Sequence, residues 1–358
     1  MEWTRGRTVG RGSSATVSAA TSCHSGDTFA VKSVELSLSG ILQREQRILS
    51  SLSSPHVVGY IGCEITNESN KLVYNLLMEY LPGGTIADIS RDRRLNEPGI
   101  GFYTRQIVQG LEYLHSSGIA HCDIKGHNIL VCEKSGAKIA DFGCARWLNA
   151  AEEEAGIGGT PMYFAPEVAR GEEQGCPADI WALGCTVIEM ATGGPPWTRV
   201  ENPVSILYRI GFSGEIPVVP GFLSDEGKDF LSKCLRTDPR ERWTAKQLLR
   251  HPFLRESNSE GEQILEFVSD SPTCVLDQGV WNSIEERETL DVVTCEGIRS
   301  DSPAERIGRL SSGSGVPHWR WDGDWIRIRR SNRGDGISGE LEVENGKCLI
   351  TVSDSSNF

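Results

Sequence analysis

The sequence lacks the features of secreted, membrane-spanning and metal-stapled proteins. No apolar run approaches the ~20 residues that cross a bilayer, and the opening stretch "MEWTRGRTVG" lacks the apolar core of a secretory signal. The eleven cysteines are odd in number and form no CxxC pair, which argues against a disulfide framework or a structural zinc site. We therefore expect a chain without a membrane segment, in the reducing environment of the cytoplasm and the nucleus.

Basic charge is also scarce, and the shortfall lies in the last third of the chain. The formal net charge is −13 at pH 7. Residues 1–255 carry 26 basic and 29 acidic side chains, whereas residues 256–358 carry 10 basic and 20 acidic ones. A phosphate backbone requires a basic face, so nucleic acid is not expected as a partner. The acidic tail suits regulators with basic docking peptides, although plain solvation explains the same composition.

The pattern along the chain predicts two structural regions and a polar tail. Residues 1–90 alternate or run apolar between glycines, which is typical of strands, with one helix predicted over residues 39–52. Helical periodicity prevails from about residue 97, and residues 179–193 are apolar enough for a buried helix. A β-rich lobe followed by a helical lobe predicts an α+β, bilobal fold with a ligand-binding cleft. Residues 255–358 are expected to be an acidic, largely disordered tail.

A glycine-rich turn is the first candidate phosphate site. Residues 9–17 read "VGRGSSATV", with Gly10 and Gly12 between predicted strands, where backbone N–H groups can approach phosphates closely. Ala15 stands at the third glycine of a GxGxxG loop, so an ordinary glycine turn also fits. A dinucleotide-binding turn fits less well, because a strand rather than a helix follows.

Lys32 and Glu45 strengthen the phosphate interpretation. Lys32 lies in the apolar strand "TFAVKS", about twenty residues after the turn, and Glu45 is predicted to face inward from the next helix. A lone lysine on a strand is ordinarily solvated. Paired with Glu45, it would aim an ammonium at the α- and β-phosphates of ATP.

Two further motifs, "HCDIKGHNIL" and "KIADFG", carry residue types that phosphoryl transfer requires. Asp123 would accept the proton of an incoming hydroxyl, and Lys125 would neutralise the transferring γ-phosphoryl group. Asn128 and Asp141 would hold Mg²⁺ against the phosphates. The combination with "APE" at residues 165–167 is highly specific, and a coincidental polar loop is a poor explanation.

These motifs resemble the eukaryotic protein kinase domain over residues 1–254, about 70% of the chain. The spelling "DIKGHN" resembles serine/threonine kinases, and "GTPMYFAPEVARG" resembles the MEKK-type mitogen-activated protein kinase kinase kinases. The combination of "WTRGRTVGRGS", "ADFGCARW" and "DIWALGCTVIEMATGGPPW" resembles the plant branch of that family. The resemblance implies the bilobal kinase fold, Mg²⁺ and ATP, and a mitogen-activated protein kinase kinase as substrate. It also implies a role in abscisic acid and stress signalling.

Carried over position by position, the resemblance implies further roles. Met78 would be the gatekeeper, with Glu79 to Leu81 as the hinge to adenine. Core packing explains Met78 equally. The catalytic residues implied are Asp123, Lys125, Lys32 and Glu45. The nucleotide site implied comprises Val9, Gly10, Arg11, Gly12, Val17, Ala30, Lys32, Met78, Glu79, Leu81, Asn128 and Asp141, the last two being the metal ligands.

The resemblance also implies roles around the catalytic loop. An apolar spine aligning the lobes would include Leu49, His121 and Phe142. For these too, core packing is the alternative. Other implied contacts are Asp179 with the catalytic-loop backbone, Glu167 with Arg242, and Thr160 with Asp123 and Lys125.

The catalytic loop departs from most kinases at Cys122, where an arginine usually receives an activation-loop phosphate. Between Asp141 and Thr160 there is no Ser, Thr or Tyr. The arginine that would bind a phosphate and the hydroxyl residues that would carry one are both absent. We therefore infer that this loop does not rely on phosphorylation for its order. One hypothesis is that Glu152–Glu154 form a permanent anionic patch facing a basic residue. A solvated charge run explains them as well.

Two rival interpretations remain at the level of sequence. Cys122 and Ala15 are the support for a pseudokinase or scaffold that binds cascade partners without phosphoryl transfer. Another kinase group that lacks the arginine, such as the immune-receptor-associated kinases, is the third possibility, and "GTPMYFAPEV" weighs against it.

In the tail, Ser271 and Ser302 each precede proline, as proline-directed sites do. The tail tryptophans Trp319, Trp321 and Trp325 form a candidate docking or packing cluster.

Overall fold

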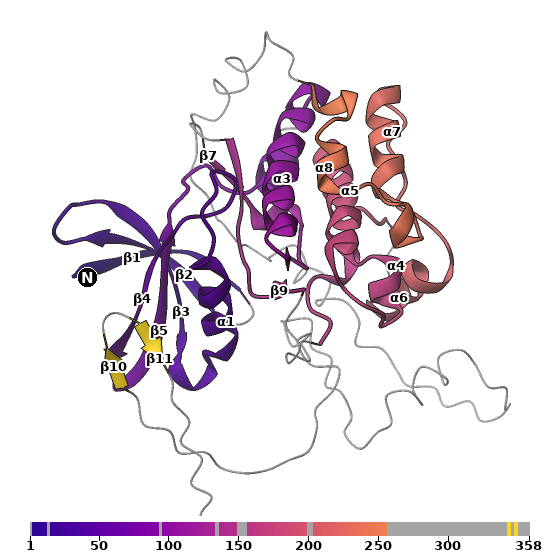
Figure 1. The fold of residues 1–358 in the computed structure, drawn as a ribbon. Helices are drawn as coiled ribbons and strands as arrows, with labels where there is room; N and C mark the ends of the chain where they lie inside the picture. The colour runs from indigo at the N-terminus through magenta and orange to yellow at the C-terminus, as the bar shows by residue number, and fades with distance from the viewer. Residues whose placement is uncertain are drawn as a thin grey trace, which may run out of the picture.

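The computed structural model places a sheet-rich lobe beside a helical lobe (Figure 1). The predicted α+β, bilobal fold is therefore confirmed. The residues that the structure describes are 2–12, 15–92, 95–132, 136–148, 156–198, 203–255, 342–344 and 347–349.

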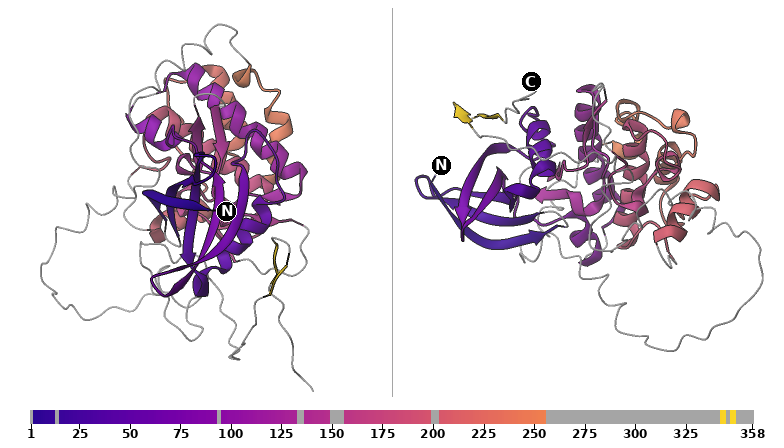
Figure 2. Two further views of the ribbon diagram at one scale, coloured as in Figure 1. Left: turned by 90° about the vertical axis from the view of Figure 1, so that its left-hand side faces the viewer. Right: turned by 90° about the horizontal axis from the view of Figure 1, so that it is seen from below.

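The N-terminal lobe is a five-stranded antiparallel sheet with the strand order β1-β2-β3-β5-β4. Lys32 sits at its centre, opposite Val17 on β2 and Leu76 on β5. The right-hand view of Figure 2 shows the sheet at one end of the molecule and the helices at the other. The strands are β1 (Trp3–Arg11), β2 (Thr16–Ser22), β3 (Thr28–Glu35), β4 (Tyr60–Glu68) and β5 (Lys71–Glu79).

The helix of this lobe, α1 (Gly40–Leu49), confirms the helix predicted from the periodicity. It follows a short 3-10 turn, η1 (Leu36–Leu38). Its buried residues recur at three- and four-residue spacing and include one charged side chain, Glu45. A carboxylate on the buried face of an amphipathic helix requires a partner, and the partner is part of the site described below.

The helical lobe is organised around α3 (Glu97–Ser116) and α5 (Cys176–Thr192). Asn96 caps the start of α3 by accepting the N–H of Gly99, and Gly193, at φ 71°, ends α5 in the left-handed region. Helix α5 is buried along nearly its whole length, as predicted for residues 179–193. The other helices are α2 (Ile86–Asp92), α4 (Pro166–Ala169), α6 (Pro203–Phe212), α7 (Asp225–Cys234) and α8 (Ala245–Leu248).

Short elements carry the catalytic segments between the long helices. Strand β6 pairs with β9, and β7 pairs with β8, so the loops after β6 and β8 are held on two-stranded ladders. These strands are β6 (Ile119–Ala120), β7 (Ile129–Cys132), β8 (Gly136–Ile139) and β9 (Arg146–Trp147). The 3-10 turns are η2 (Gly126–Asn128), η3 (Pro161–Tyr163), η4 (Pro239–Glu241) and η5 (Pro252–Leu254).

One hydrophobic core runs from the sheet into the helical lobe. Ala30 and Met78 of the sheet belong to the same buried cluster as Leu111 of α3 and Trp181 of α5. A smaller cluster around Phe29 packs against Trp3 on the sheet. The continuous core fixes the two lobes against each other, and the charged site lies where they meet.

Several predictions fall on residues that the structure does not describe. Within the tail it describes one antiparallel pair, β10 (Glu342–Glu344) with β11 (Lys347–Leu349), which the sequence did not predict. Among the helices it describes, none has both the length and the apolar character to cross a bilayer. Predictions outside the described residues are the disorder of the rest of residues 256–358, the patch Glu152–Glu154, Ser271, Ser302 and the tryptophans Trp319, Trp321 and Trp325.

Candidate active site

Lys32 lies at the centre of a charged trio that joins the sheet to the helical lobe. Its Nζ on β3 donates to Glu45 Oε2 of α1 at 2.7 Å and to Asp141 Oδ1, after β8, at 2.9 Å. Burial alone would lower the pKa of Lys32, but Asp141 and Glu45 outweigh burial and raise it. At Asp141 burial is outweighed in the same way by Lys32, and the pKa of that carboxyl falls. Lys32 is therefore positive and Asp141 negative at neutral pH.

Glu45 is the buried carboxylate of the trio, with only 1% of the residue exposed. Burial raises the pKa of Glu45, and Lys32 opposes that shift. Its Oε1 also accepts the main-chain N–H of Phe142 at 3.3 Å, so α1 is tied both to β3 and to the segment after β8. Asp141 adopts φ 63°, a conformation uncommon for a residue other than glycine. The bonds to this segment hold it there.

The catalytic loop between β6 and β7 brings four predicted residues together. Thr160 Oγ1 donates to Asp123 Oδ1 at 2.8 Å and accepts from Lys125 Nζ at 2.7 Å. Lys125 Nζ also lies 3.1 Å from Asp123 Oδ2. Asn128 Nδ2 donates to Asp123 Oδ2 at 3.0 Å and to the Asp123 carbonyl at 2.8 Å. The contacts of Thr160 with Asp123 and Lys125 are those that the resemblance implied.

Lys125 stays protonated in this arrangement. Burial favours its neutral form, but the carboxylates of Asp123 and Asp141 outweigh burial and raise the pKa of Lys125. A fixed positive charge therefore lies 3.1 Å from the Asp123 carboxylate, on a side chain that is 18% exposed.

Asp179 of α5 holds the backbone of the catalytic loop. Its Oδ2 accepts from His121 N at 2.8 Å and its Oδ1 from Cys122 N at 2.8 Å, as the resemblance implied. His115 Nε2 of α3 lies 2.9 Å from Oδ2. Burial favours the neutral imidazole, but Asp179, with a contribution from Cys176, raises the pKa of His115 to about 9. Cys122 is held at φ 66° between these bonds.

The expected spine residues lie in the core, and two of them, His121 and Phe142, are in contact. The rings of His121 and Phe142 pack edge to face with centroids 4.9 Å apart, and Leu49 is 1% exposed. His121 Nε2 donates to the Ala140 carbonyl at 3.1 Å, which leaves Nδ1 to accept the N–H of Asp123 at 3.3 Å. One imidazole tautomer therefore satisfies both bonds.

The first residues expected to bind the nucleotide lie on strands β1 and β2 and in the turn between them. Val9, Gly10 and Arg11 are on β1, and Gly12 N donates to the Ala15 carbonyl at 2.9 Å to close the turn. Val17 is on β2 and packs against the main core.

The gatekeeper and hinge positions follow on β5. Ala30 of β3 is the direct cross-strand partner of Met78, and Leu81 is 2% exposed. The side chain of Glu79 is already paired, because Lys138 Nζ donates to both of its carboxylate oxygens at 2.7 and 2.8 Å.

A buried ion pair closes the far side of the helical lobe. Arg242 donates to both carboxylate oxygens of Glu167 at 2.6 and 2.7 Å, as the resemblance implied. The side chains are 1% and 5% exposed. Arg242 also donates to the carbonyls of Arg236 and Pro177, which joins α4 to the start of α5.

Two residues that were not predicted from the sequence, Arg44 and Glu189, hold the site from behind. Arg44 Nη2 of α1 donates to the Gly143 carbonyl at 2.6 Å. Glu189 of α5 accepts the N–H of Gly126 at 2.9 Å, and burial raises the pKa of Glu189 to about 7. The signal for Glu189 was a second carboxylate, besides Asp179, inside an apolar helix. Arg44 carried no signal, because an arginine on an amphipathic helix is ordinarily solvated.

Asn128 and Asp141 offer oxygen ligands of the kind Mg²⁺ prefers. The amide nitrogen of Asn128 is taken up by Asp123, which leaves Oδ1 for a cation. Asp141 uses Oδ1 for Lys32 and Gly143, which leaves Oδ2. No group of three or more His, Cys, Asp or Glu residues is gathered as a metal site in the described part of the chain. Since Mg²⁺ ordinarily takes one or two carboxylates together with substrate phosphates, this donor set fits it as a partner of ATP.

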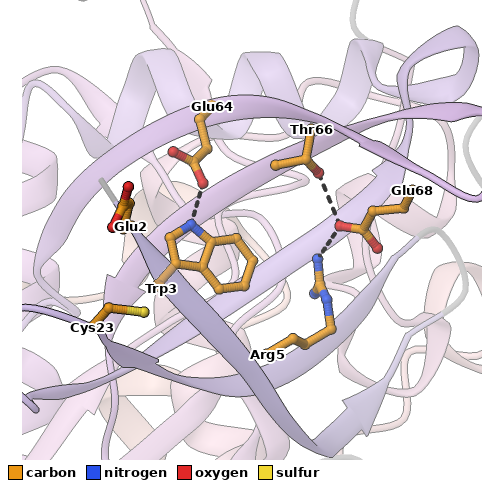
Figure 3. Close-up of a pocket in the computed structure, with 7 residues that line it drawn as sticks. All are labelled: Glu2, Trp3, Arg5, Cys23, Glu64, Thr66 and Glu68. Carbon is orange, nitrogen blue, oxygen red and sulfur yellow. Dashed lines mark hydrogen bonds and ion pairs between the residues drawn. The ribbon is translucent and has the colours of Figure 1, made fainter.

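A separate hollow of about 680 Å³ lies on the sheet between its edge strands β1 and β4 (Figure 3). The indole of Trp3 donates to Glu64, and Arg5 Nη2 donates to Glu68 at 2.7 Å. None of the predicted nucleotide or catalytic residues lines it. This hollow is therefore not the candidate active site.

Comparison with known proteins agrees with the geometry. The profile of the protein kinase domain matches residues 3–254. Mitogen-activated protein kinase kinase kinase 17 of Arabidopsis thaliana is 51% identical, over 95% of this chain and 96% of that relative. Kinase kinase kinase 18 of the same plant is 52% identical, over 92% of this chain and 100% of the relative, and number 20 is 40% identical over the same shares. The chain therefore belongs to the plant MEKK-type mitogen-activated protein kinase kinase kinases and is a serine/threonine protein kinase.

Proposed function

We propose that this kinase transfers the γ-phosphoryl group of ATP to Ser or Thr of a mitogen-activated protein kinase kinase, through the residues assembled around Asp123. The observation that carries the proposal is the network in which Asp123 bonds Thr160, Lys125 and Asn128 at 2.8 to 3.1 Å. The Thr160 hydroxyl on Asp123 occupies a hydroxyl-binding position, and a substrate hydroxyl requires the same kind of acceptor.

Each residue has a role that follows from its charge and partners. Asp123 accepts the proton of the substrate hydroxyl. Lys125, whose pKa is raised, supplies positive charge to the transferring group. Lys32, fixed by Glu45, holds the α- and β-phosphates. Positioning and charge neutralisation are most of what phosphoryl transfer needs.

Asn128 and Asp141 would hold Mg²⁺. The ion would neutralise phosphate charge and help to orient the γ-phosphoryl group. Asp141 is suited to this because its pKa is lowered, which keeps it anionic well into acidic solution. Asn128 is suited because Asp123 fixes the orientation of its amide.

The rival interpretation as a scaffold gains no support from these contacts. Cys122, its main basis, contributes its main chain to Asp179, while each residue assigned to phosphate or metal keeps a charged or hydrogen-bonded partner. Ala15 accepts the turn-closing bond from Gly12 through its carbonyl, which any residue provides.

The finer physiological proposals rest on the relatives and on composition. The relatives are named as kinases of mitogen-activated protein kinase kinases, which supports that substrate class. We further propose an abscisic acid or stress pathway, a location in cytoplasm and nucleus, and residues 255–358 as an acidic tail that binds basic segments of regulators. Imaging of a fluorescent fusion, with and without the hormone, tests the location and the pathway.

The deciding experiment uses the full chain, made in bacteria and treated with phosphatase. It measures phosphate transfer onto a panel of kinase-dead plant mitogen-activated protein kinase kinases. Transfer by the wild type that is lost in Asp123→Asn and Lys32→Met would support the proposal, and the preferred panel member would name the pathway. No transfer by the wild type to any member, before or after incubation with plant extract, would favour the scaffold.

A further inference from the structure

A neutral side chain, Gln174, bonds the main chain of Cys122, the residue that stands where an arginine is usual. It lies between α4 and α5 and is 4% exposed. Its Nε2 donates to the Cys122 carbonyl at 3.1 Å and to the Gly158 carbonyl at 2.9 Å. Its Oε1 accepts from Gly158 N at 3.2 Å and from Arg146 Nη2 at 3.0 Å. An amide has two donor hydrogens and two acceptor lone pairs, and all four are used.

These four bonds join three segments that a kinase must align. Cys122 directly precedes Asp123, Arg146 is on β9 after the Asp141 segment, and Gly158 is in the segment that leads to Thr160. Both the N–H and the carbonyl of Gly158 bond to this one side chain. Gln174 therefore fixes the backbone two residues before the Thr160 hydroxyl that bonds Asp123.

The backbone beside Gly158 is fitted tightly to the catalytic loop. Gly159 adopts φ 112°, and a Cβ there would clash with the carbonyl oxygen of Cys122. Arg146 Nη2 donates in addition to the Gly156 carbonyl at 3.1 Å. The segment from residue 156 to residue 160 is thus held by hydrogen bonds to Arg146, Gln174, Asp123 and Lys125.

The group at the arginine position cannot receive a phosphate. Cys122 is 6% exposed, and burial raises the pKa of its thiol well above the usual range, so the side chain is neutral. A buried amide that makes all its hydrogen bonds is stable without a counter-ion, whereas a buried guanidinium needs an anion. A neutral bridge and a neutral thiol are therefore consistent with each other.

We propose that Gln174 is a positioning residue that orders the activation segment for substrate binding without phosphorylation. It acts through Gly158 and Thr160 and does not touch the reacting atoms. The proposal rests on the phosphoryl-transfer function proposed above, because it concerns regulation of the same site.

The test compares Gln174→Met, which keeps the length but removes all four bonds, with Gln174→Glu, which keeps the acceptors and removes the two donors. Gln247→Met is the matched control, because Gln247 makes a reciprocal capping box with Thr244 at the start of α8, away from the site. The full chain is treated with phosphatase in every case. We expect kcat to fall ~10- to 100-fold in both Gln174 variants, as for a small misplacement of reacting groups. The KM for ATP should be unchanged, and Gln247→Met should keep wild-type kcat.

Amide hydrogen exchange gives a readout that does not depend on any substrate. The Gly158 N–H should exchange at least ~10-fold faster in Gln174→Met than in the wild type and in Gln247→Met, since its acceptor is gone. This result stands even if the wild type phosphorylates no panel member, so failure of the proposed function is distinguishable. The proposal is overturned if Gly158 exchange or kcat is unchanged in both Gln174 variants, or if phosphatase treatment alone lowers wild-type kcat to their level.

Discussion

Lys32 forms ion pairs with two carboxylates at once, which distinguishes it from the other lysine of the sheet, Lys71. It reaches Glu45 and Asp141 from a side chain that is 13% exposed. Lys71 also pairs with a single carboxylate, Glu35, but its side chain is 67% exposed. The difference in exposure decides which pair has a fixed geometry, because exposed pairs are screened and mobile.

Lys32→Met should lower kcat/KM for ATP at least ~100-fold, about 2.7 kcal/mol of transition-state stabilisation, because the phosphates lose their fixed ammonium. Lys71→Met removes an ammonium from the neighbouring strand β5 and should leave kcat/KM at the wild-type value. Steady-state kinetics at saturating substrate protein measure both. A loss of similar size in Lys71→Met would mean that the sheet, and not the ion trio, had been damaged.

His115 supplies a prediction for stability against pH. The pKa of His115 is about 9 in the folded protein and near 6.5 in an unfolded chain. A group whose pKa is raised by folding stabilises the protein fully at pH values below its unfolded pKa. This stabilisation is lost as pH rises through its folded pKa. The His115–Asp179 contact should therefore contribute up to about 3 kcal/mol below pH 6.5, declining to little above pH 9.

Urea unfolding of the wild type and of His115→Gln at pH 6 and pH 9.5 measures that contribution. The difference between the two proteins should be largest at pH 6 and should shrink at pH 9.5. His24→Gln, an exposed histidine, is the control and should behave as the wild type at both values. A difference that grew with pH would contradict a charged His115.

Most of the site could be predicted from the sequence because its residues lie in short, chemically distinctive motifs. Asp123, Lys125 and Asn128 are within six positions, and the inward phase of Glu45 follows from helical periodicity. Gln174 could not be predicted. Three of its four bonds are to main-chain atoms 16 and 52 positions away, and a backbone N–H or carbonyl leaves no mark in the sequence.

At the scale of elements, the long helices and paired strands were predictable and the two-residue strands were not. Helices α1, α3 and α5 show apolar periodicity or a continuous apolar run in the sequence. These apolar residues are the ones buried in the fold. Strands β6 and β9 have two residues each, which is too short to show any period. Their pairing depends on the tertiary fold, and it is what carries the catalytic loop.

The buried ion pair between Glu167 of α4 and Arg242 gives a prediction for the free energy of unfolding. Glu167→Gln keeps the shape but leaves the guanidinium without its anion, which should destabilise the protein by about 3–5 kcal/mol. Glu172→Gln breaks the comparable but exposed pair with Arg170 at 2.6 Å and should change stability little. Denaturant unfolding measures both. Equal effects would mean that burial does not set the value of these pairs.

At the scale of the whole molecule, the lobes are coupled by the continuous core and by the trio of Lys32, Glu45 and Asp141. Two of the three charges sit on the sheet lobe and one on the helical side. A ligand that bonds both Lys32 and Asp141 therefore binds the folded arrangement and has no equivalent in the unfolded chain. Nucleotide binding should be visible as stability of the entire kinase domain.

A non-hydrolysable ATP analogue with Mg²⁺ at ~100 times its dissociation constant should add about 2.7 kcal/mol to the unfolding free energy. The rise should be seen in Tm, and chelation of Mg²⁺ by EDTA should remove most of it, because phosphate charge would then face Asp141 unshielded. Asp141→Asn removes the anionic ligand at nearly constant size, so its Tm should respond to the analogue equally with and without Mg²⁺. Asp27→Asn, in an exposed turn, should keep the full Mg²⁺-dependent rise. If Asp141→Asn kept that rise as well, Asp141 would not be a metal ligand, and the trio would serve only to hold the two lobes together.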